Sequence, residues 1–314
     1  MQNRIVEITS DNVHLALSRG FMKITQGNEK LGQIDVTDMS ALIVRGYSAS
    51  ISINLCARLA LENVPVVICG ANQSPASILW PIDGHHKQGQ RMQAQASTTK
   101  PLKKRLWQSL VKAKILAQAA ALDHIGANSS SLRLMAKRVK TGDHENIEAQ
   151  AARRYWPAMM GAEFRRGKSG VPQEYATDSP DINALLNYGY TVLRAACARS
   201  ILTAGLHPSL SLHHESAGDA LRLADDLMEP FRPWVDIVAY QCVQQREAGE
   251  DVLSKQHKAK LAAVLTMDLH TAHGASPLQL CLDRLATSLA QIFLGEKTYL
   301  DLPNAPMPLA LHSG

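Results

Sequence analysis

Short apolar segments separated by polar turns run through the first part of the chain. Segments of about five residues with strand-like composition occupy positions 5–9, 13–17, 21–25, 31–36 and 41–44. Turn-forming stretches such as Ser10-Asp11-Asn12 and Gln26-Gly27-Asn28 separate them. One helix is predicted over residues 52–62, where apolar residues follow three- and four-residue spacings. The short, β-branched apolar run at residues 64–70 predicts a buried central strand.

Helical patterns replace the strand patterns after about residue 88. Helices are predicted over residues 105–122, 131–139, 146–160, 182–204, 218–228, 235–245, 254–267 and 276–294. Residues 165–180 contain Gly, Pro and charged residues without periodicity, which predicts a loop. We therefore expect an α+β fold with a small N-terminal β domain (residues 1–82), a larger all-helical catalytic domain (residues 83–302) and a tail (residues 303–314).

The composition is typical of a folded protein that stays in the cytoplasm. Of 314 residues, 46% are hydrophobic, which excludes a disordered chain. The five cysteines form no CxxC pair, so we expect reduced, mostly buried thiols. The first residues lack the apolar core of a secretion signal, and no later run approaches the ~20 apolar residues of a transmembrane helix. We expect no membrane partner.

Positive charge is concentrated in one segment. Between Arg91 and Lys140 there are eleven basic residues and one acid, Asp123, whereas the whole chain has a net charge of +5. Such segregation favours a surface that binds nucleic acid, because lysine and arginine release counterions when they contact phosphates. The alternative interpretation is a solvated helix face that only maintains solubility.

Two groups of residues could carry chemistry. Glu148 lies near the start of a predicted helix, where it could be a metal ligand or an ordinary first-turn charge. Asp226 and Glu229 are three residues apart on a second predicted helix, so they share one face. His213 and His214 precede that helix in a loop. One histidine with several carboxylates suits Mg²⁺ or Mn²⁺, although paired acids near a helix end are often only solvated charge.

Other catalytic patterns are missing or weak. The sequence contains no GxxxxGK[ST], GxGxxG, GxSxG or HExxH motif, so it gives no support for nucleotide hydrolysis, dinucleotide chemistry, serine hydrolysis or zinc peptidase activity. The histidines of the pair His85-His86 and of the segment 268–274 have no nearby carboxylate on a clear helical face. We expect structural or surface roles for them.

Several ordered motifs carry a resemblance to a known family. They are Glu148-x-x-Ala151-Ala152-x-x-Tyr155-Trp156, the run NALLNYGY at residues 183–190, His213-His214, and the run DLMEPFRP at residues 226–233 with Asp236 beyond it. In this order they resemble the CRISPR-associated integrase/endonuclease, the larger universal protein of the spacer-acquisition complex. The resemblance covers nearly the whole chain. The length and the N-terminal half look most like the version from single-effector (type II) systems.

The resemblance implies a set of site residues. The family's metal-binding glutamate corresponds to Glu148, its histidine ligand to His214 and its acidic ligand to Glu229, with Asp226 as an additional metal-binding or supporting carboxylate. The ion would be Mg²⁺ or Mn²⁺. His213 is the residue most easily confused with the ligand, and the sequence leaves the choice between the two imidazoles open.

The resemblance also implies a reaction and partners. The 3′-hydroxyl of a short double-stranded DNA (the prespacer) would attack a phosphodiester of the CRISPR repeat, in a transesterification that inserts a spacer. Basic residues between Arg91 and Lys140, with Arg165, Arg166 and Lys168, would bind phosphate backbones. The β domains would form a homodimer, and two dimers would join a small ferredoxin-like adaptation partner in a hetero-hexamer.

Two other functions stay open at this stage. A stand-alone metal-dependent nuclease acting on branched or single-stranded DNA would use the same residues without joining strands. A non-catalytic DNA-binding scaffold would need only the basic segment.

Overall fold

The computed structural model describes residues 4–70, 75–82, 84–167, 180–216, 219–247, 249–272 and 274–304. The chain forms two compact units, Met1–Gln88 and Gly89–Gly314. The predicted boundary after residue 82 falls between the last strand of the first unit, which ends at Leu79, and a helix that begins at Gln88.

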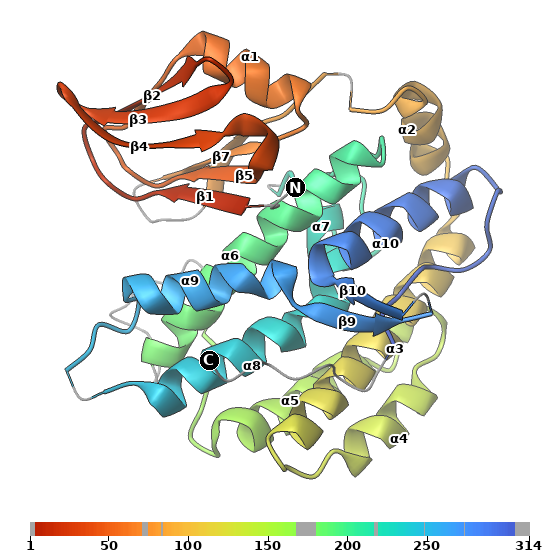
Figure 1. The fold of residues 1–314 in the computed structure, drawn as a ribbon. Coiled ribbons are helices and arrows are strands. Elements are labelled where there is room, and N and C mark those ends of the chain that lie inside the picture. Colours follow the sequence, from red (N-terminus) through yellow and green to blue (C-terminus); the bar gives the residue numbers. More distant parts are fainter. Residues whose placement is uncertain are drawn as a thin grey trace. The chain divides into compact units, whose positions relative to one another are not determined.

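In its described residues, the first unit contains two four-stranded sheets, one α-helix and the short 3₁₀ helix η1 (Val36–Asp38) (Figure 1). One sheet has the order β4-β3-β2-β6 and the other β1-β5-β7-β8. The elements are β1 (Arg4–Ile8), β2 (Val13–Ser18), β3 (Phe21–Gln26), β4 (Glu29–Asp35), β5 (Met39–Val44), β6 (Ser50–Ile51), α1 (Ile53–Leu61), β7 (Val66–Cys69) and β8 (Pro75–Leu79). All the predicted strands and the predicted helix are present, with ends shifted by one or two residues.

A single core joins the two sheets and the helix of this unit. Alternate residues of the strands point inward, among them Leu15 of β2, Met22 of β3 and Leu42 of β5, and Leu55 and Leu59 of α1 are fully buried with them. The sequence analysis missed β6 and β8. β6 has two residues and exists through parallel pairing with β2, and β8 begins at a proline and pairs antiparallel with β7. Tertiary pairing defines both strands, so neither has a pattern of its own.

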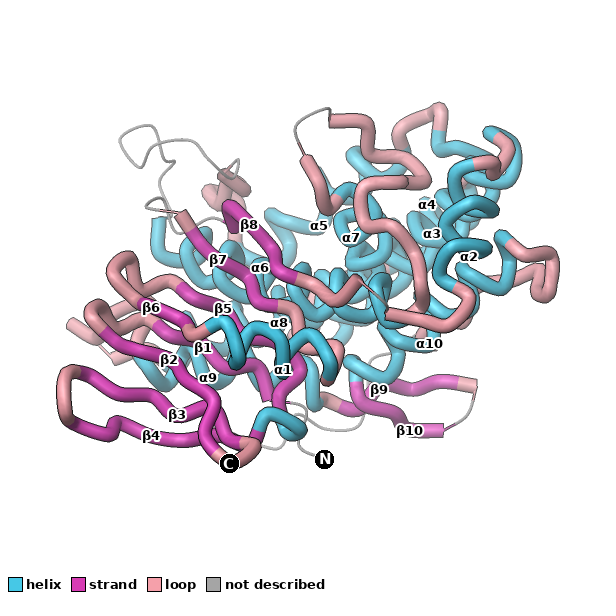
Figure 2. Tube along the Cα trace, turned by 90° about the horizontal axis from the view of Figure 1, so that it is seen from above, coloured by secondary structure: helices cyan, strands magenta, loops and turns pink. Residues whose placement is uncertain are grey.

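The second unit is mainly helical, as Figure 2 shows by its predominantly cyan tube. Its elements are α2 (Gln88–Ala96), α3 (Lys100–His124), α4 (Ser130–Arg138), α5 (Ile147–Met160), α6 (Pro180–Thr203), α7 (Arg222–Met228), the 3₁₀ helix η4 (Glu229–Phe231), α8 (Arg232–Gln245), α9 (Lys255–Ala263), β9 (Asp268–Thr271), β10 (Gly274–Pro277) and α10 (Leu278–Phe293). Helix α3 packs against α4, α5, α7, η4 and α8, and α6 packs against α7, α8, α9 and α10.

The close contact between α6 and α8 explains one motif glycine. A Cβ atom on Gly189 would lie 2.4 Å from Val235 Cγ1, so the NALLNYGY run needs glycine where the two helices cross. This contact brings the two most specific runs of the sequence together, because Val235 directly follows the DLMEPFRP run and Trp234.

The expected fold class is confirmed: a β region is followed by a mainly helical region. The description of the second region as all-helical was wrong in one place, because β9 and β10 form an antiparallel hairpin. The sequence analysis also missed α2, a polar, glutamine-rich helix that lacks an apolar stripe. Helix α3 begins five residues earlier than predicted, with Pro101 in its first turn, where a missing N–H costs nothing.

Several smaller expectations can be compared with the structure. All five cysteines are free, and all except Cys56 are buried. Among the residues that the structure describes, no helix is both long and apolar enough to cross a membrane. Most of the predicted loop at 165–180 and most of the predicted tail at 303–314 lie outside the described residues.

Candidate metal centre

The first turn of α5 fixes the position of Glu148. Asp143, in the preceding turn, accepts hydrogen bonds from the backbone N–H groups of Ile147 (2.9 Å) and Glu148 (3.0 Å). Both N–H groups lie in the first turn of α5, where backbone N–H groups have no acceptor within the helix. The Glu148 carboxylate is thereby held at the helix N-terminus, with its side chain 24% exposed.

Lys114 links Glu148 to Glu229. It lies on the buried side of α3, among Leu110, Val111 and Ile115, and its side chain is only 12% exposed. Its Nζ atom lies 2.5 Å from Glu148 Oε1 and 2.5 Å from Glu229 Oε2. Burial alone would lower the pKa of Lys114, but the charges of Glu229 and Glu148 outweigh burial and raise it. The lysine is therefore a cation between two carboxylates.

Glu229 is buried at the junction of three helical segments. It begins η4, directly after α7 and before α8, and the prolines at 230 and 233 fit the first turns of η4 and α8. Arg232 Nε lies 3.1 Å from Glu229 Oε1. Burial would raise the pKa of Glu229, but the charges of Arg232 and Lys114 outweigh burial and lower it. A buried carboxylate is thus kept ionised by two cations.

Asp226 organises the loop that carries the histidines. It is fully buried and accepts hydrogen bonds from the backbone N–H groups of Leu212 (2.6 Å), His213 (3.1 Å) and His214 (3.2 Å). Its Oδ1 also lies 2.7 Å from His214 Nδ1. Because an ionised carboxylate only accepts, Nδ1 carries the proton, and Nε2 of a neutral His214 has its lone pair available for a cation.

The two adjacent imidazoles have different surroundings. The His213 ring stacks on Trp107 at 4.3 Å between centroids, with 5° between the planes. The His214 ring meets Trp107 edge-on and binds Asp226. That hydrogen bond is the main cause of a raised pKa at His214, with burial opposing it and the charge of Glu229 adding to it. His214, and not His213, therefore belongs to the acidic group.

Two further groups hold the histidine loop in place. Arg194 of α6 binds Asp219, after the loop, and Asp225, in α7, at 2.6 to 2.8 Å. Gln95 of α2 donates to the carbonyls of His207 and Leu210 and accepts from the His207 N–H. The loop is thus fixed at both ends, and α2 has a structural reason to exist despite its polar sequence.

Two buried tyrosine hydroxyls and the carboxylate of Asp236 form a hydrogen-bonded group next to Arg232. The hydroxyls of Tyr155 (2.8 Å) and Tyr190 (2.5 Å) donate to Asp236, and the Arg232 guanidinium lies over the Tyr190 ring at 4.7 Å. Burial raises the pKa of Asp236 to about 6, and the two tyrosine hydrogen bonds oppose that shift. Motif residues from α5, α6 and α8 therefore meet beside Glu229.

The donor set suits a hard divalent cation. One oxygen of Glu148 and one oxygen of Glu229 both contact the Lys114 Nζ atom at 2.5 Å, so the two carboxylates lie close together. His214 can add a ring nitrogen to these oxygen donors. Carboxylate oxygens with one imidazole fit Mg²⁺ or Mn²⁺. Across the described ranges, no three His, Cys, Asp or Glu side chains form a ready-made metal site, and Lys114 occupies the space between the carboxylates. The chemistry of the donors fits the metal, although the geometry shown is that of an ion-pair cluster.

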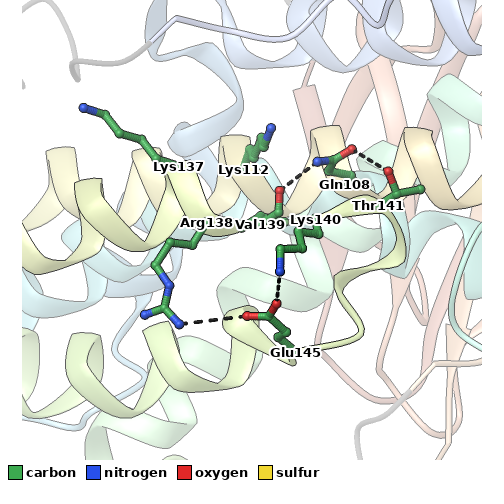
Figure 3. Close-up of a pocket in the computed structure, with 8 residues that line it drawn as sticks. All are labelled: Gln108, Lys112, Lys137, Arg138, Val139, Lys140, Thr141 and Glu145. Carbon is green, nitrogen blue, oxygen red and sulfur yellow. Dashed lines mark hydrogen bonds and ion pairs between the residues drawn. The ribbon is translucent and has the colours of Figure 1, made fainter.

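Basic residues of α3 and α4 line a separate cavity of about 670 Å³. Figure 3 shows Lys112 and Lys137 pointing away from Glu145, whereas Arg138 and Lys140 point toward it. We call this set, with Gln108, Val139 and Thr141, the basic pocket. It confirms that part of the basic segment forms one surface.

Not every basic residue of that segment is available to a ligand. Arg91 is buried and donates to the Ala204 carbonyl, and Lys114 belongs to the acidic cluster. Arg166, also expected to bind phosphate, donates to Asn183 and Asn187 and lies over Tyr190. Lys168 lies outside the described residues.

Three histidines that the sequence analysis set aside, His85, His86 and His270, have contacts within the described residues. His85 and His86 stack on each other, and the carbonyl of His270 in β9 accepts a hydrogen bond from Asn304. His273 lies outside the described residues, and the roles expected for these histidines stay predictions.

Comparison with known proteins identifies the family. Residues 6–270 match the family described as CRISPR associated protein Cas1. The CRISPR-associated endonuclease Cas1 of Neisseria meningitidis serogroup C (strain 8013) is 34% identical over 250 residues, covering 78% of this chain and 79% of that protein. The expected similarity to the version from single-effector systems fits this relative.

Solved structures share the fold. A casposase bound to integration product matches with a TM-score of 0.76 and 20% identity, over 95% of this chain and 92% of that one. A chain of a Cas6-RT-Cas1–Cas2 complex matches with a TM-score of 0.69 and 15% identity, over 94% of this chain and 35% of that one. With the family match over most of its length and a relative of this identity, the chain belongs to the CRISPR-associated Cas1 family.

Proposed function

We propose that this protein is a divalent-metal-dependent DNA integrase and endonuclease that inserts short DNA segments into a CRISPR array. The observation that carries the proposal is that Glu148 and Glu229 each contact the Lys114 Nζ atom at 2.5 Å, while Asp226 orients His214, whose pKa is raised in part by the charge of Glu229. The names of the relatives support the class of reaction: one is a CRISPR-associated endonuclease, and one solved structure holds an integration product.

Glu148, His214 and Glu229 would hold Mg²⁺ or Mn²⁺. A bound ion of this kind lowers the pKa of an attacking hydroxyl and neutralises charge that develops on phosphoryl oxygens. Asp226 acts as a positioning residue, because its oxygens are already occupied by three backbone N–H groups and the His214 ring. It keeps the Nε2 lone pair of His214 available.

The basic pocket would bind the phosphate backbone of DNA. It contains four cations (Lys112, Lys137, Arg138 and Lys140) against one acid, Glu145. No ATP is needed for strand transfer, since one phosphodiester replaces another. With water in place of the 3′-hydroxyl, the same site would cleave DNA.

We further propose that the chain acts as a homodimer, formed through its β domain, with a small ferredoxin-like partner in a hetero-hexamer. The matched Cas6-RT-Cas1–Cas2 complex supports a partnered assembly. The first unit exposes Tyr47 (83%), Ile53 (82%) and Leu61 (78%), which an interface could cover.

A strand-transfer assay tests this function. It combines supercoiled plasmid carrying a repeat, a short duplex with free 3′ ends, the small partner and Mn²⁺ or EDTA, with His213→Ala as the matched control for His214→Ala. We expect the duplex to become covalently joined to the plasmid, and expect EDTA and His214→Ala, but not His213→Ala, to abolish joining. Nicking without joining would indicate the stand-alone nuclease, and DNA binding with neither activity would indicate the scaffold.

A further inference from the structure

Lys114 has surroundings that an ordinary helix lysine does not have. Its neighbours on α3, Leu110, Val111 and Ile115, are fully buried, yet its ammonium contacts two carboxylates at 2.5 Å each. Those carboxylates, Glu148 and Glu229, are the acidic metal ligands of the proposed function, on which this inference rests.

The charges of four ion-paired residues balance without a metal ion. The positive charges of Lys114 and Arg232 match the negative charges of Glu148 and Glu229, and every ion pair in this group is 3.1 Å or shorter. Without a cation, the buried Glu229 and the partly exposed Glu148 would repel each other, and leaving one buried charge unpaired is strongly destabilising. The lysine therefore stabilises the arrangement of the ligands before any metal arrives.

The same contacts mean that a metal ion has to compete with the lysine. A cation bound by both carboxylates needs the oxygens that Nζ now contacts at 2.5 Å each. We propose that Lys114 is a resident counter-cation: it holds Glu148 and Glu229 in place in the metal-free protein and gives up at least one of them when Mg²⁺ or Mn²⁺ binds.

This exchange has a consequence for substrate binding. The four charges cancel in the metal-free cluster, and a divalent ion adds two positive charges to it. An anionic phosphodiester is then attracted to these four residues and the ion, which together carry positive charge. Metal binding and DNA binding at the centre become coupled through the displaced ammonium.

Direct metal titration tests the proposal. Mn²⁺ binding to the full chain, without DNA, is measured by electron paramagnetic resonance for wild type, Lys114→Met and the matched control Lys112→Met, which alters a lysine of the same helix that lines the basic pocket. Because a competing cation is removed, we expect Lys114→Met to bind Mn²⁺ about tenfold more tightly and to melt at a lower temperature in EDTA. Lys112→Met should change neither quantity.

The outcomes separate this proposal from the function itself. Unchanged or weaker Mn²⁺ binding by folded Lys114→Met would overturn the counter-cation role, because a purely structural lysine predicts weaker binding. If His214→Ala binds Mn²⁺ as tightly as wild type does, the proposed metal site is wrong instead. If Lys114→Met does not fold, a crystal structure of the wild type with Mn²⁺ decides: Lys114 Nζ should have left one carboxylate, and retention of both contacts beside a bound ion contradicts the proposal.

Discussion

Helix α3 carries two lysines, two residues apart, in opposite electrostatic surroundings. Lys114 is buried between Glu148 and Glu229, in a cluster whose charges compensate one another. Lys112 lines the basic pocket, where four cations face one acid. Two residues rotate a helix by about 200°, so neighbouring lysines point to nearly opposite sides.

Under the proposed function, one helix takes part in both the chemistry and the binding of DNA. On the buried face, each charge has a fixed partner and geometry, which suits the orientation of a metal ion and a reacting phosphate. On the exposed face, surplus positive charge with few fixed partners suits a backbone of many phosphates. Residue type alone assigns neither role; burial and partners do.

The largest expected effect on stability comes from a substitution in the buried ion-pair cluster around Lys114. Glu229→Ala leaves Lys114 and Arg232 without their shared carboxylate, and we expect it to lower the free energy of unfolding by about 3 to 5 kcal/mol. Glu145→Ala, in the basic pocket, removes an acid that is 36% exposed and should cost less than about 1 kcal/mol. Urea unfolding in EDTA measures both, and equal losses would show that burial does not distinguish the two sides.

A second prediction concerns the buried acid behind Arg232. Because the pKa of Asp236 is about 6 in the folded protein and the ordinary value is 3.8, the folded state binds the extra proton. Its stability contribution is present at low pH and falls as the pH rises from about 4 to about 6, by roughly 3 kcal/mol. Asp236→Asn removes this titration.

Urea unfolding of wild type and Asp236→Asn at a series of pH values between about 4 and 7 measures this difference. The cost of Asp236→Asn should be greatest at low pH and should shrink as the pH rises. A cost that is the same at every pH would contradict the raised pKa.

A third prediction concerns Asp226, which orients His214, one of the proposed metal ligands. Asp226→Asn keeps the shape of the side chain but no longer offers two carboxylate oxygens to the histidine loop, so His214 loses its fixed tautomer. We expect Mn²⁺ affinity to fall by about 10- to 100-fold. Isothermal titration with Mn²⁺ gives the affinity, and Asp123→Asn, an exposed acid of α3, is the control. Equal affinity in Asp226→Asn and wild type would remove its positioning role.

The smallest expected effect on stability comes from a substitution in the basic pocket. Lys137→Gln removes one cation of the basic pocket and should change the free energy of unfolding by less than about 0.5 kcal/mol. Its DNA affinity should fall severalfold, with the slope of log affinity against log salt reduced by about one. Fluorescence anisotropy at several salt concentrations measures this, with Lys297→Gln, whose lysine pairs with Asp301, as the control. An unchanged slope would exclude Lys137 from phosphate contact.

Much of the fold follows from local pattern, and the exceptions share a physical cause. Strands such as β2 and helices such as α10 have clear periodicity and were predicted to within about two residues. The two-residue strand β6 and the polar helix α2 were missed because partners define them: β2 for the first, and the loop at 204–210 for the second. Contacts between residues far apart in the sequence leave no pattern in the local sequence of either element.

The site shows the same limit. Motifs pointed to Glu148, His214, Asp226 and Glu229 as site residues, and their roles stay predictions. The structure links Glu148 to Glu229 through Lys114, and His214 to Asp226. Lys114 was counted only as one of the eleven basic residues, although its place in the apolar stripe of α3 was a readable signal. The hydrogen bond that distinguishes His214 from His213 depends on loop geometry, which no spacing encodes.

The most direct test of the division of labour compares two variants in one experiment. DNA affinity and the single-turnover rate of strand joining at saturating DNA are measured with Mn²⁺ for His214→Ala and for the double variant Lys137→Gln/Lys140→Gln. We expect His214→Ala to bind DNA as wild type does and to join no strands, and the double variant to bind weakly and to join at the wild-type rate once saturated. Joining by His214→Ala at the wild-type rate would contradict the assignment of the reaction to this metal centre.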